Sequence, residues 1–261
     1  MSSPLKNVII VGAAGRLGTS ILATFDADLN FNISILSRKS SKSVFPARLV
    51  VHRFSDEYPE DELLEALKGQ DAAIKAGVKR FVPSEFGSDT RNEKGMEIIP
   101  QYFKHKLDTV EYLKGKEMEG LTWSAFVTAI IYNEGKDAYS TTTIASIGTA
   151  LKNKLLHPEE TANKHLFISS FHVSQNQILA SLKRTTGKKW DVTYVDAEEQ
   201  KKIGMEKMAK GDFSGAMGLI RYTNSVKGHG GYYAGYEEMS NELLGVQGED
   251  LDEVVREIVK G

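Results

Sequence analysis

Three glycines near the amino-terminal end of the chain, Gly12, Gly15 and Gly18, follow the apolar run Val8–Val11. Without a Cβ, Gly12 can turn sharply out of a strand, Gly15 lets the main chain approach a phosphate, and Gly18 lets a following helix pack close to the sheet. The amides of the first helical turn and the helix dipole would then face an anion. The pattern predicts a pyrophosphate-binding loop, although a glycine-rich turn between any strand and helix has the same pattern.

The residues around the glycines favour the phosphate-binding interpretation. Apolar residues recur every four positions, at Leu17, Ile21 and Phe25, and predict a helix that starts near Arg16. A second strand, Ile33–Leu36, follows at the distance that a strand-helix-strand unit requires. We therefore expect contacts to a dinucleotide cofactor from the turn and the first helical residues: Gly12, Ala13, Ala14, Gly15, Arg16, Leu17 and Gly18.

The residues after the second strand indicate which dinucleotide is bound. Proteins that prefer NAD usually carry Asp or Glu there to bind the ribose 2′-hydroxyl. This chain has Ser37-Arg38-Lys39-Ser40 instead, and two cations with two hydroxyls suit a 2′-phosphate. The sequence thus favours NADPH (NADP) over NADH, with Arg38 as the main contact and Lys39 and Ser40 as secondary ones. The alternative is that Arg38 and Lys39 are solvated loop charges.

The composition is typical of a globular enzyme domain. The 261 residues carry a formal net charge of -2 with a pI of about 6.3, so no general attraction to nucleic acid is expected. The chain has no cysteine and its six histidines lack metal-site spacing, which argues against disulfides and a metal centre. We find no apolar stretch long enough to span a bilayer and no signal peptide at Met1, and therefore expect a cytoplasmic protein.

Strand-like and helix-like segments alternate in the first half of the chain. The predicted strands lie near Val8–Val11, Ile33–Leu36, Leu49–His52, Val78–Val82 and Thr122–Val127, and the predicted helices near Arg16–Phe25, Pro59–Lys68 and Gln101–Glu119. This alternation indicates an α/β fold with a doubly wound parallel sheet of the Rossmann type. We expect an NADP-binding domain over residues 1–130 and a smaller, mixed substrate-binding lobe over 131–261, with the two interleaved.

Two local signals stand out in the second half of the chain. Ser174 with Gln177 predicts a capping box at the start of a helix that ends by Gly187. The Gly/Tyr-rich stretch 228–236 is the best candidate for a mobile surface loop or lid.

Two further segments carry a family resemblance. Residues 79–87 read Lys-Arg-Phe-Val-Pro-Ser-Glu-Phe-Gly, and residues 155–163 read Leu-Leu-His-Pro-Glu-Glu-Thr-Ala-Asn. Together with the glycine motif they resemble the NmrA-like and isoflavone reductase-like family of atypical short-chain dehydrogenases, especially its fungal branch, over essentially the whole chain. The resemblance implies NADPH-dependent reduction of a small aromatic or conjugated-carbonyl substrate. Some relatives instead bind the dinucleotide without turnover and act as redox-sensing regulators, and an inactive shortened variant is a further alternative.

The resemblance also implies catalytic residues. In the reductases of this family, a lysine on the helix after the Pro-Ser-Glu-Phe-Gly loop is a general acid/base or an orienting cation, and Lys106 stands at that position. By spacing alone, Lys104 and Lys106 would be ordinary solvated helix lysines. Tyr102 precedes Lys106 by four residues and so lies on the same helix face. Tyr-x-x-x-Lys is the pair with which typical short-chain dehydrogenases protonate a carbonyl oxygen.

Three more residues are assigned to the site by the same resemblance. Ser84, at a strand end, is expected to reach the cofactor and the same reaction centre. Val127 and Thr128, at the end of the next strand, are expected to line the substrate pocket, although core and strand terminus is an equally good interpretation of both. A small-molecule substrate is the expected partner, and a homodimer is left open.

The chain also departs from the family pattern. Between Asp71 and Ala72, relatives carry another strand and the start of a helix, and a second shortfall follows Tyr132–Gly135. Parallel strands need intervening crossovers, so this loss leaves the first strand without its central neighbour or forces Val78–Val82 into that place. Val110 stands where reductases of the group often carry an arginine, which weakens the cofactor grip or the ancestral substrate preference.

The loss of a central strand has an energetic consequence. Each large apolar side chain buried by such a strand contributes roughly 1.5–3 kcal/mol. Several of them amount to much of a net stability of about 5–15 kcal/mol.

Overall fold

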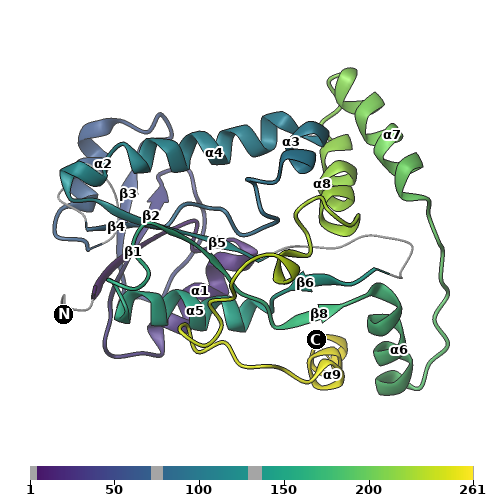
Figure 1. Ribbon diagram of the computed structural model, residues 1–261. Helices are drawn as coiled ribbons and strands as arrows, with labels where there is room; N and C mark the ends of the chain where they lie inside the picture. The colour runs from purple at the N-terminus through teal and green to yellow at the C-terminus, as the bar shows by residue number, and fades with distance from the viewer. Residues whose placement is uncertain (1–4, 72–78, 129–136, 261) are drawn as a thin grey trace.

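The protein forms an α/β fold on two parallel half-sheets, which the computed structural model describes over residues 5–71, 79–128 and 137–260 (Figure 1). The strands of the first half-sheet are, in spatial order, β1 (Asn7–Val11), β2 (Asn32–Arg38) and β3 (Val50–Phe54). Those of the second are β4 (Arg80–Phe81), β5 (Thr122–Val127) and β7 (Lys164–Phe167). All pairings within the half-sheets are parallel, which confirms the predicted Rossmann-like class.

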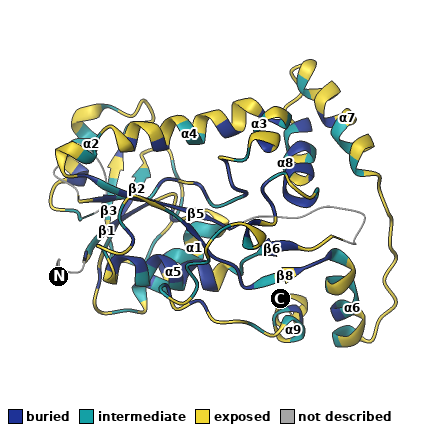
Figure 2. Cartoon of the chain, in the orientation of Figure 1, coloured by how far each residue is buried: buried dark blue, intermediate teal, exposed yellow. Residues whose placement is uncertain are grey.

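Helices cover both faces of the half-sheets because alternate strand side chains are apolar on both sides. One layer contains α1 (Arg16–Asp26) and α5 (Ile144–Leu156), whose core includes Ile10 of β1. The opposite layer contains α2 (Glu60–Leu67), which packs near Ile9, and α4 (Pro100–Lys114), which packs near Trp123. Figure 1 shows α4 above the strands with α1 and α5 below them, and Figure 2 shows buried residues concentrated between these layers.

The carboxyl-terminal half adds a small antiparallel pair and several helices. The pair consists of β6 (Tyr139–Thr141) and β8 (Phe171–Val173). The helices here are α6 (Gln175–Thr186), α7 (Ala197–Ala209), α8 (Gly215–Ser225), the 3-10 turn η2 (Tyr233–Gly235) and α9 (Leu251–Lys260). Helix α8 packs against the short α3 (Glu93–Ile98), and η1 (Glu117–Glu119) follows α4. No helix in the described ranges is long and apolar enough to cross a bilayer.

Several local predictions are confirmed by the structure and others are met in part. Helix α1 starts at Arg16, and the Ser174–Gln177 capping box is present, with Gly187 in the left-handed conformation at φ 65°. The stretch 228–236, predicted as a mobile surface loop or lid, is anchored by Tyr233, which is fully buried and whose hydroxyl donates to the Ile168 carbonyl at 2.7 Å, while Tyr232 and Tyr236 are exposed. Of the strand predicted over Val78–Val82, Arg80–Phe81 is strand, and Val78 lies outside the described residues.

The two half-sheets are separated where the sequence predicts a missing strand. Within the described ranges β1 pairs with β2 and β4 pairs with β5, so β4 has not moved beside β1. A cavity of about 650 Å³ lies between the half-sheets, lined mostly by apolar residues of β1, α1 and α5 and by Phe81 and Val82. Among the described strands, the spatial order 3-2-1 followed by 4-5-7 is that of a doubly wound sheet in which β1 and β4 are not paired with each other.

Asp71 joins the two half-sheets at the bottom of this gap. Its N–H donates to the Asn7 carbonyl at 2.8 Å, and its own carbonyl accepts from the Lys79 and Arg80 amides at 3.0 and 2.9 Å. Its carboxylate accepts from the Lys6 and Asn7 amides, both at 2.9 Å, and pairs with Lys79. One residue thus satisfies main-chain groups at the start of both β1 and β4.

Asp71→Asn should lower the free energy of unfolding by about 1–2 kcal/mol at pH 7, because the hydrogen bonds lose their charge. Burial raises the pKa of Asp71, but the bonds from Asn7 and Lys6 and the Lys79 pair outweigh burial and hold it below the ordinary 3.8. The stabilisation is therefore complete above that ordinary value and disappears as the pH falls through the lower folded pKa. Urea unfolding at several pH values should show the two proteins converging in acid.

Asp108→Asn is the matched control, because Asp108 forms an exposed ion pair with Lys104 within one helix. Such pairs contribute little, so this variant should unfold almost as the parent does. A pH-independent difference for Asp71→Asn would contradict the charge-based role of this carboxylate.

Candidate functional site

The glycine turn between β1 and α1 has the geometry that a phosphate-binding loop requires. Gly12 adopts φ +75° and its carbonyl accepts from the Gly15 amide at 2.9 Å, which closes a tight turn. A Cβ on Gly18 would overlap the Gly12 carbonyl oxygen and lie 2.9 Å from the Ala13 Cα. Helix α1 therefore packs directly on the turn. Ala13 is buried, but Ala14, Gly15 and Arg16 are exposed, so the first amides of α1 are accessible to an anion.

Two cations extend from the same edge of the first half-sheet. Val11 is opposite Leu36 in the register, so the turn after β1 and Arg38 at the end of β2 lie at the carboxyl edge of the strands. The Arg38 side chain is 57% exposed, and its Nε lies 3.8 Å from an Asp56 carboxylate oxygen, a loose contact. Lys39 pairs closely with Glu62 at 2.7 Å. An incoming anion would therefore displace the carboxylate partner of Arg38 more easily than that of Lys39.

Lys106 reaches from α4 to the loop that follows β4. Its Nζ donates to the main-chain carbonyls of Ser84 at 2.8 Å and Glu85 at 2.5 Å. Burial lowers the pKa of Lys106, and the negative Glu85 partly opposes this shift. Lys104, two residues away, is instead in an exposed ion pair with Asp108. The structure thus distinguishes the two lysines that spacing alone left equivalent.

Tyr102 lies beside Lys106 but offers its ring rather than its hydroxyl. The Lys106 Nζ is 5.2 Å from the centre of the Tyr102 ring, a cation–π geometry. Burial raises the pKa of Tyr102, and Glu85 raises it further. A tyrosine that donates a proton near neutral pH needs the opposite shift. The geometry therefore favours Lys106 over Tyr102 as the proton-handling group.

Glu85 is a site residue that the sequence analysis did not single out. Its side chain is 1% exposed and accepts a hydrogen bond from the Thr90 hydroxyl at 2.9 Å. Burial raises the pKa of Glu85, while Lys106 and Thr90 oppose this effect. A buried carboxylate needs a compensating charge, and Lys106 supplies one. The acidic residue within Pro-Ser-Glu-Phe-Gly, next to Ser84, was the signal available in the sequence.

The two residues assigned to the substrate pocket are buried. Val127 is 1% exposed and packs with Phe167 and Tyr233 in an apolar cluster. Thr128 is 4% exposed, and its amide donates to the Gly87 carbonyl at 2.8 Å. These contacts are those of a core residue, for Val127, and of a strand terminus, for Thr128. Val110 is likewise buried, against Leu113 and Trp123, so its side chain belongs to the core beneath α4.

The cavity between the half-sheets brings the predicted cofactor residues together. Gly12, Gly15, Arg16, Leu17 and Gly18 line it from one side, and Ser84 lines it from the other. Arg38 and Lys106 are not among its lining residues, although Lys106 anchors the Ser84 carbonyl. Ser84 therefore lies across the cavity from the glycine turn, as a cofactor-binding residue would.

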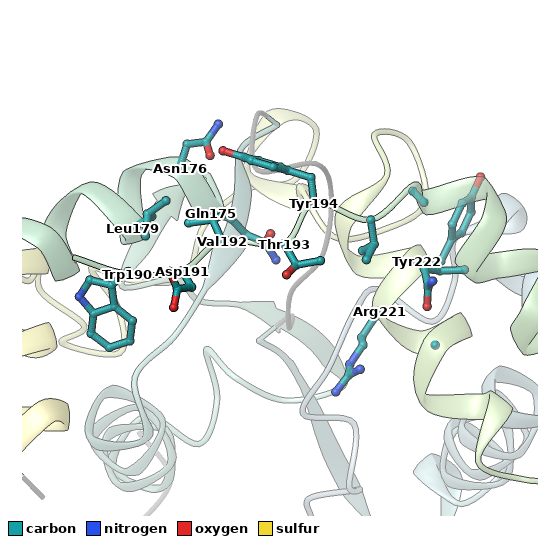
Figure 3. A pocket seen from close by; sticks show the side chains of 14 residues that line it. Gln175, Asn176, Leu179, Trp190, Asp191, Val192, Thr193, Tyr194, Arg221 and Tyr222 are labelled. Carbon is teal, nitrogen blue, oxygen red and sulfur yellow. The ribbon is translucent and has the colours of Figure 1, made fainter. Parts of the chain in front are cut away.

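A second pocket, of about 440 Å³, lies in the carboxyl-terminal half (Figure 3). Leu179 of α6 and Tyr222 of α8 lie on opposite sides of it, and the irregular segment 190–195 crosses between them. This segment contributes Trp190 and Tyr194, so the walls combine aromatic rings with a few polar groups. Pockets of this composition suit aromatic ligands. The sequence analysis did not identify these residues.

The fold and the glycine turn together define a Rossmann-like protein with an NAD(P)-binding architecture. The model of the NmrA-like family matches residues 50–144. The oxidoreductase aprR of Aspergillus flavus is 44% identical and is aligned over 97% of this chain and 99% of its own length. The chain belongs to the NmrA-like family.

Solved structures show the same fold at low sequence identity. An isoflavone reductase has a TM-score of 0.73 at 19% identity, with 97% of this chain and 99% of that chain covered. The Citrobacter sp. triphenylmethane reductase, solved with NADP(H), has a TM-score of 0.67 at 17% identity, with 97% and 99% covered. The alignment with the Aspergillus protein spans 293 positions, so at least 32 of them have no counterpart among the 261 residues here.

Gly18→Ala should destabilise the protein by about 1–3 kcal/mol, because the new methyl group meets backbone atoms of Gly12 and Ala13 that cannot move without opening the turn. This cost should exceed the helix propensity that alanine gains, at most about 1 kcal/mol. Gly248→Ala is the matched control, since a Cβ there meets nothing within 4 Å. Equal urea midpoints for the two variants would disprove the close packing of α1 on the turn.

Proposed function

We propose that the chain is an NADPH-dependent reductase that transfers a hydride to a small aromatic or conjugated-carbonyl molecule. The observation that carries the proposal is the position of Lys106. Its Nζ donates to the Ser84 and Glu85 carbonyls, and Ser84 lines the same cavity as the glycine turn. The relatives support it, because aprR is an oxidoreductase and the Citrobacter reductase binds NADP(H).

The residues present fit a dinucleotide phosphate. Gly12 turns the chain at φ +75°, and Gly18 lets α1 pack directly on that turn, so that the first amides of α1 lie beside it. Arg38, exposed and only loosely paired with Asp56, would hold the 2′-phosphate. When bound, the nicotinamide supplies the hydride. Ser84 would orient it from the opposite side of the cavity.

Lys106 would handle the proton. An ammonium group has three N–H donors, and the Ser84 and Glu85 carbonyls account for two of them. The third can donate to a substrate oxygen that gains negative charge as it is reduced. A lysine pKa lowered by burial makes this donation easier near neutral pH, while Glu85 keeps the charged form populated.

Lys106→Met should lower kcat by about 10²–10⁴-fold with a smaller change in KM, because it removes the proton donor and leaves the cofactor loop intact. The rate would be followed as NADPH oxidation with a panel of aromatic enones. In the parent protein the rate should fall as the pH rises through a lysine pKa below 10.5, and Lys106→Arg should move this fall to higher pH.

Lys104→Met is the control, since Lys104 is exposed and paired with Asp108. An unchanged rate in Lys106→Met would refute the catalytic assignment. Tight NADPH binding without oxidation by any substrate of the panel would favour the regulatory, non-catalytic alternative.

Arg38→Ala should weaken NADPH binding by about 10–100-fold and leave NADH binding nearly unchanged, because only NADPH carries the 2′-phosphate. Isothermal titration with both nucleotides measures the ratio. Lys39→Ala is the matched variant and should have a smaller effect, since Lys39 already pairs with Glu62. An unaltered preference in Arg38→Ala would rule out this residue as the selector.

A further inference from the structure

An exposed segment, residues 188–196, joins α6 to α7 and is called the α6–α7 segment below. It runs along the outer edge of the molecule, away from the half-sheets (Figure 1), and every one of its residues is exposed. Within the described part of the chain, residues 189–195 form no main-chain hydrogen bond. The segment also carries large apolar side chains, among them Tyr194, which is 63% exposed. Apolar side chains and peptide groups that lack protein partners are thus offered to solvent together.

The composition of the α6–α7 segment is that of a β-strand. Residues 190–195 read Trp-Asp-Val-Thr-Tyr-Val, in which β-branched and aromatic residues prevail. The segment ends at Asp196 in extended conformation, at φ -72° and ψ 129°. In an extended chain alternate residues share a face, so Trp190, Val192 and Tyr194 would lie together. A strand of this kind without a neighbour is a template for pairing with another strand.

The order of residues on that face is self-complementary. The alternate positions are, in chain order, Lys188, Trp190, Val192, Tyr194 and Asp196. When a second copy runs antiparallel with its Val192 opposite the first Val192, Trp190 meets Tyr194 and Lys188 meets Asp196. A twofold axis through the centre makes each of these pairs occur twice. Aromatic pairs and opposite-charge pairs are the cross-strand contacts that stabilise antiparallel strands.

The charges at the two ends select this register. A slide of two residues in one direction would place Asp196 opposite Trp190, and a slide in the other would place Lys188 opposite Tyr194. Both slides remove the two ion pairs and the aromatic pairs. Asp196 caps α7 with one carboxylate oxygen, which accepts from the Glu199 amide at 2.8 Å. Neither Lys188 nor Asp196 forms an ion pair within the described ranges, so both charges can serve a second copy.

We infer that the α6–α7 segment is the interface of a homodimer, in which two copies pair as antiparallel strands centred on Val192. Trp190 of each copy packs against Tyr194 of the other, and the peptide groups of the two segments bond to each other. Two strands of nine residues make a small interface, so the dimer forms and dissociates with protein concentration. Neither the glycine turn nor Lys106 takes part, so the inference stands apart from the proposed reductase activity.

The first test is sedimentation equilibrium of the full chain, which should show a monomer–dimer equilibrium. Lys188→Glu places two carboxylates opposite each other at both ends of the pair, and should raise the dissociation constant by roughly tenfold or more. Lys189→Glu is the matched control, because it makes the same change of charge one residue away. Lys189 is opposite Val195 in this register, on the other face, so the control should dimerise nearly as the parent does.

The second test mixes two charge-reversed variants. Asp196→Lys alone should weaken the dimer as Lys188→Glu does, since two ammonium groups then face each other. In the mixed pair both ends again join opposite charges, so the mixture should associate more tightly than either variant alone. Restored association also shows that both variants are folded.

Tryptophan emission gives an independent readout. Trp123 is buried and Trp190 is exposed, so emission that shifts to the blue as the protein is concentrated reports burial of Trp190. A protein that stays monomeric at every concentration would overturn the inference. So would equal dissociation constants for Lys188→Glu and Lys189→Glu, or a mixture that associates no better than its two components.

Discussion

A single residue, Asp71, joins the main chains of the two half-sheets, and the geometry of the site depends on this joint. Main-chain groups buried in a sheet must be hydrogen-bonded, and Asp71 satisfies groups of both β1 and β4 at the level where their pairing would otherwise begin. The layer of α1 and α5 provides the second connection, because its core includes Ile10 from one half-sheet and Phe126 from the other. Hydrogen bonds set the spacing, and apolar packing supplies most of the stabilisation.

This arrangement divides the candidate site between two bodies of sheet. The glycine turn and Arg38 belong to the first half-sheet, whereas Ser84 and Lys106 are attached to the second. In a continuous sheet, hydrogen bonds along the strands would hold these two sets in register. Here their register depends on Asp71 and the helix layer, so a ligand that touches both sets would also strengthen the joint.

The sequence was most informative where a residue type has one physical reason to be present. Gly12 and Gly187 have the positive φ that only glycine adopts readily, and Ser174 has its capping partner three residues on. The gap after Asp71 was visible because a crossover needs a minimum number of residues. The half-sheets and their parallel order follow from the same rules.

The sequence was least informative where tertiary contacts decide the outcome. The stretch 228–236 has a loop composition, but its Tyr233 is buried and donates a hydrogen bond to Ile168, a residue 65 positions away in the chain. Val127 lies at a strand end, where pocket residues are common, yet Phe167 and Tyr233 cover it. Glu85 was overlooked because an isolated acidic residue is usually solvated, and only the fold shows that it is buried near Lys106.

Comparison of Lys106 with Lys154 shows why a perturbed lysine is not in itself a functional one. Burial pushes the pKa of Lys154 well below its ordinary value and Arg80 lowers it further, but the side chain is 0% exposed and its Nζ has no hydrogen-bond partner among the described residues. It lies 5.4 Å from the Phe126 ring centre, enclosed in the core. Lys106 is less perturbed but is half-buried, has a carboxylate nearby and reaches the Ser84 carbonyl beside a cavity. Proton transfer needs access and a countercharge as well as a shifted pKa, and of these two lysines Lys106 has both.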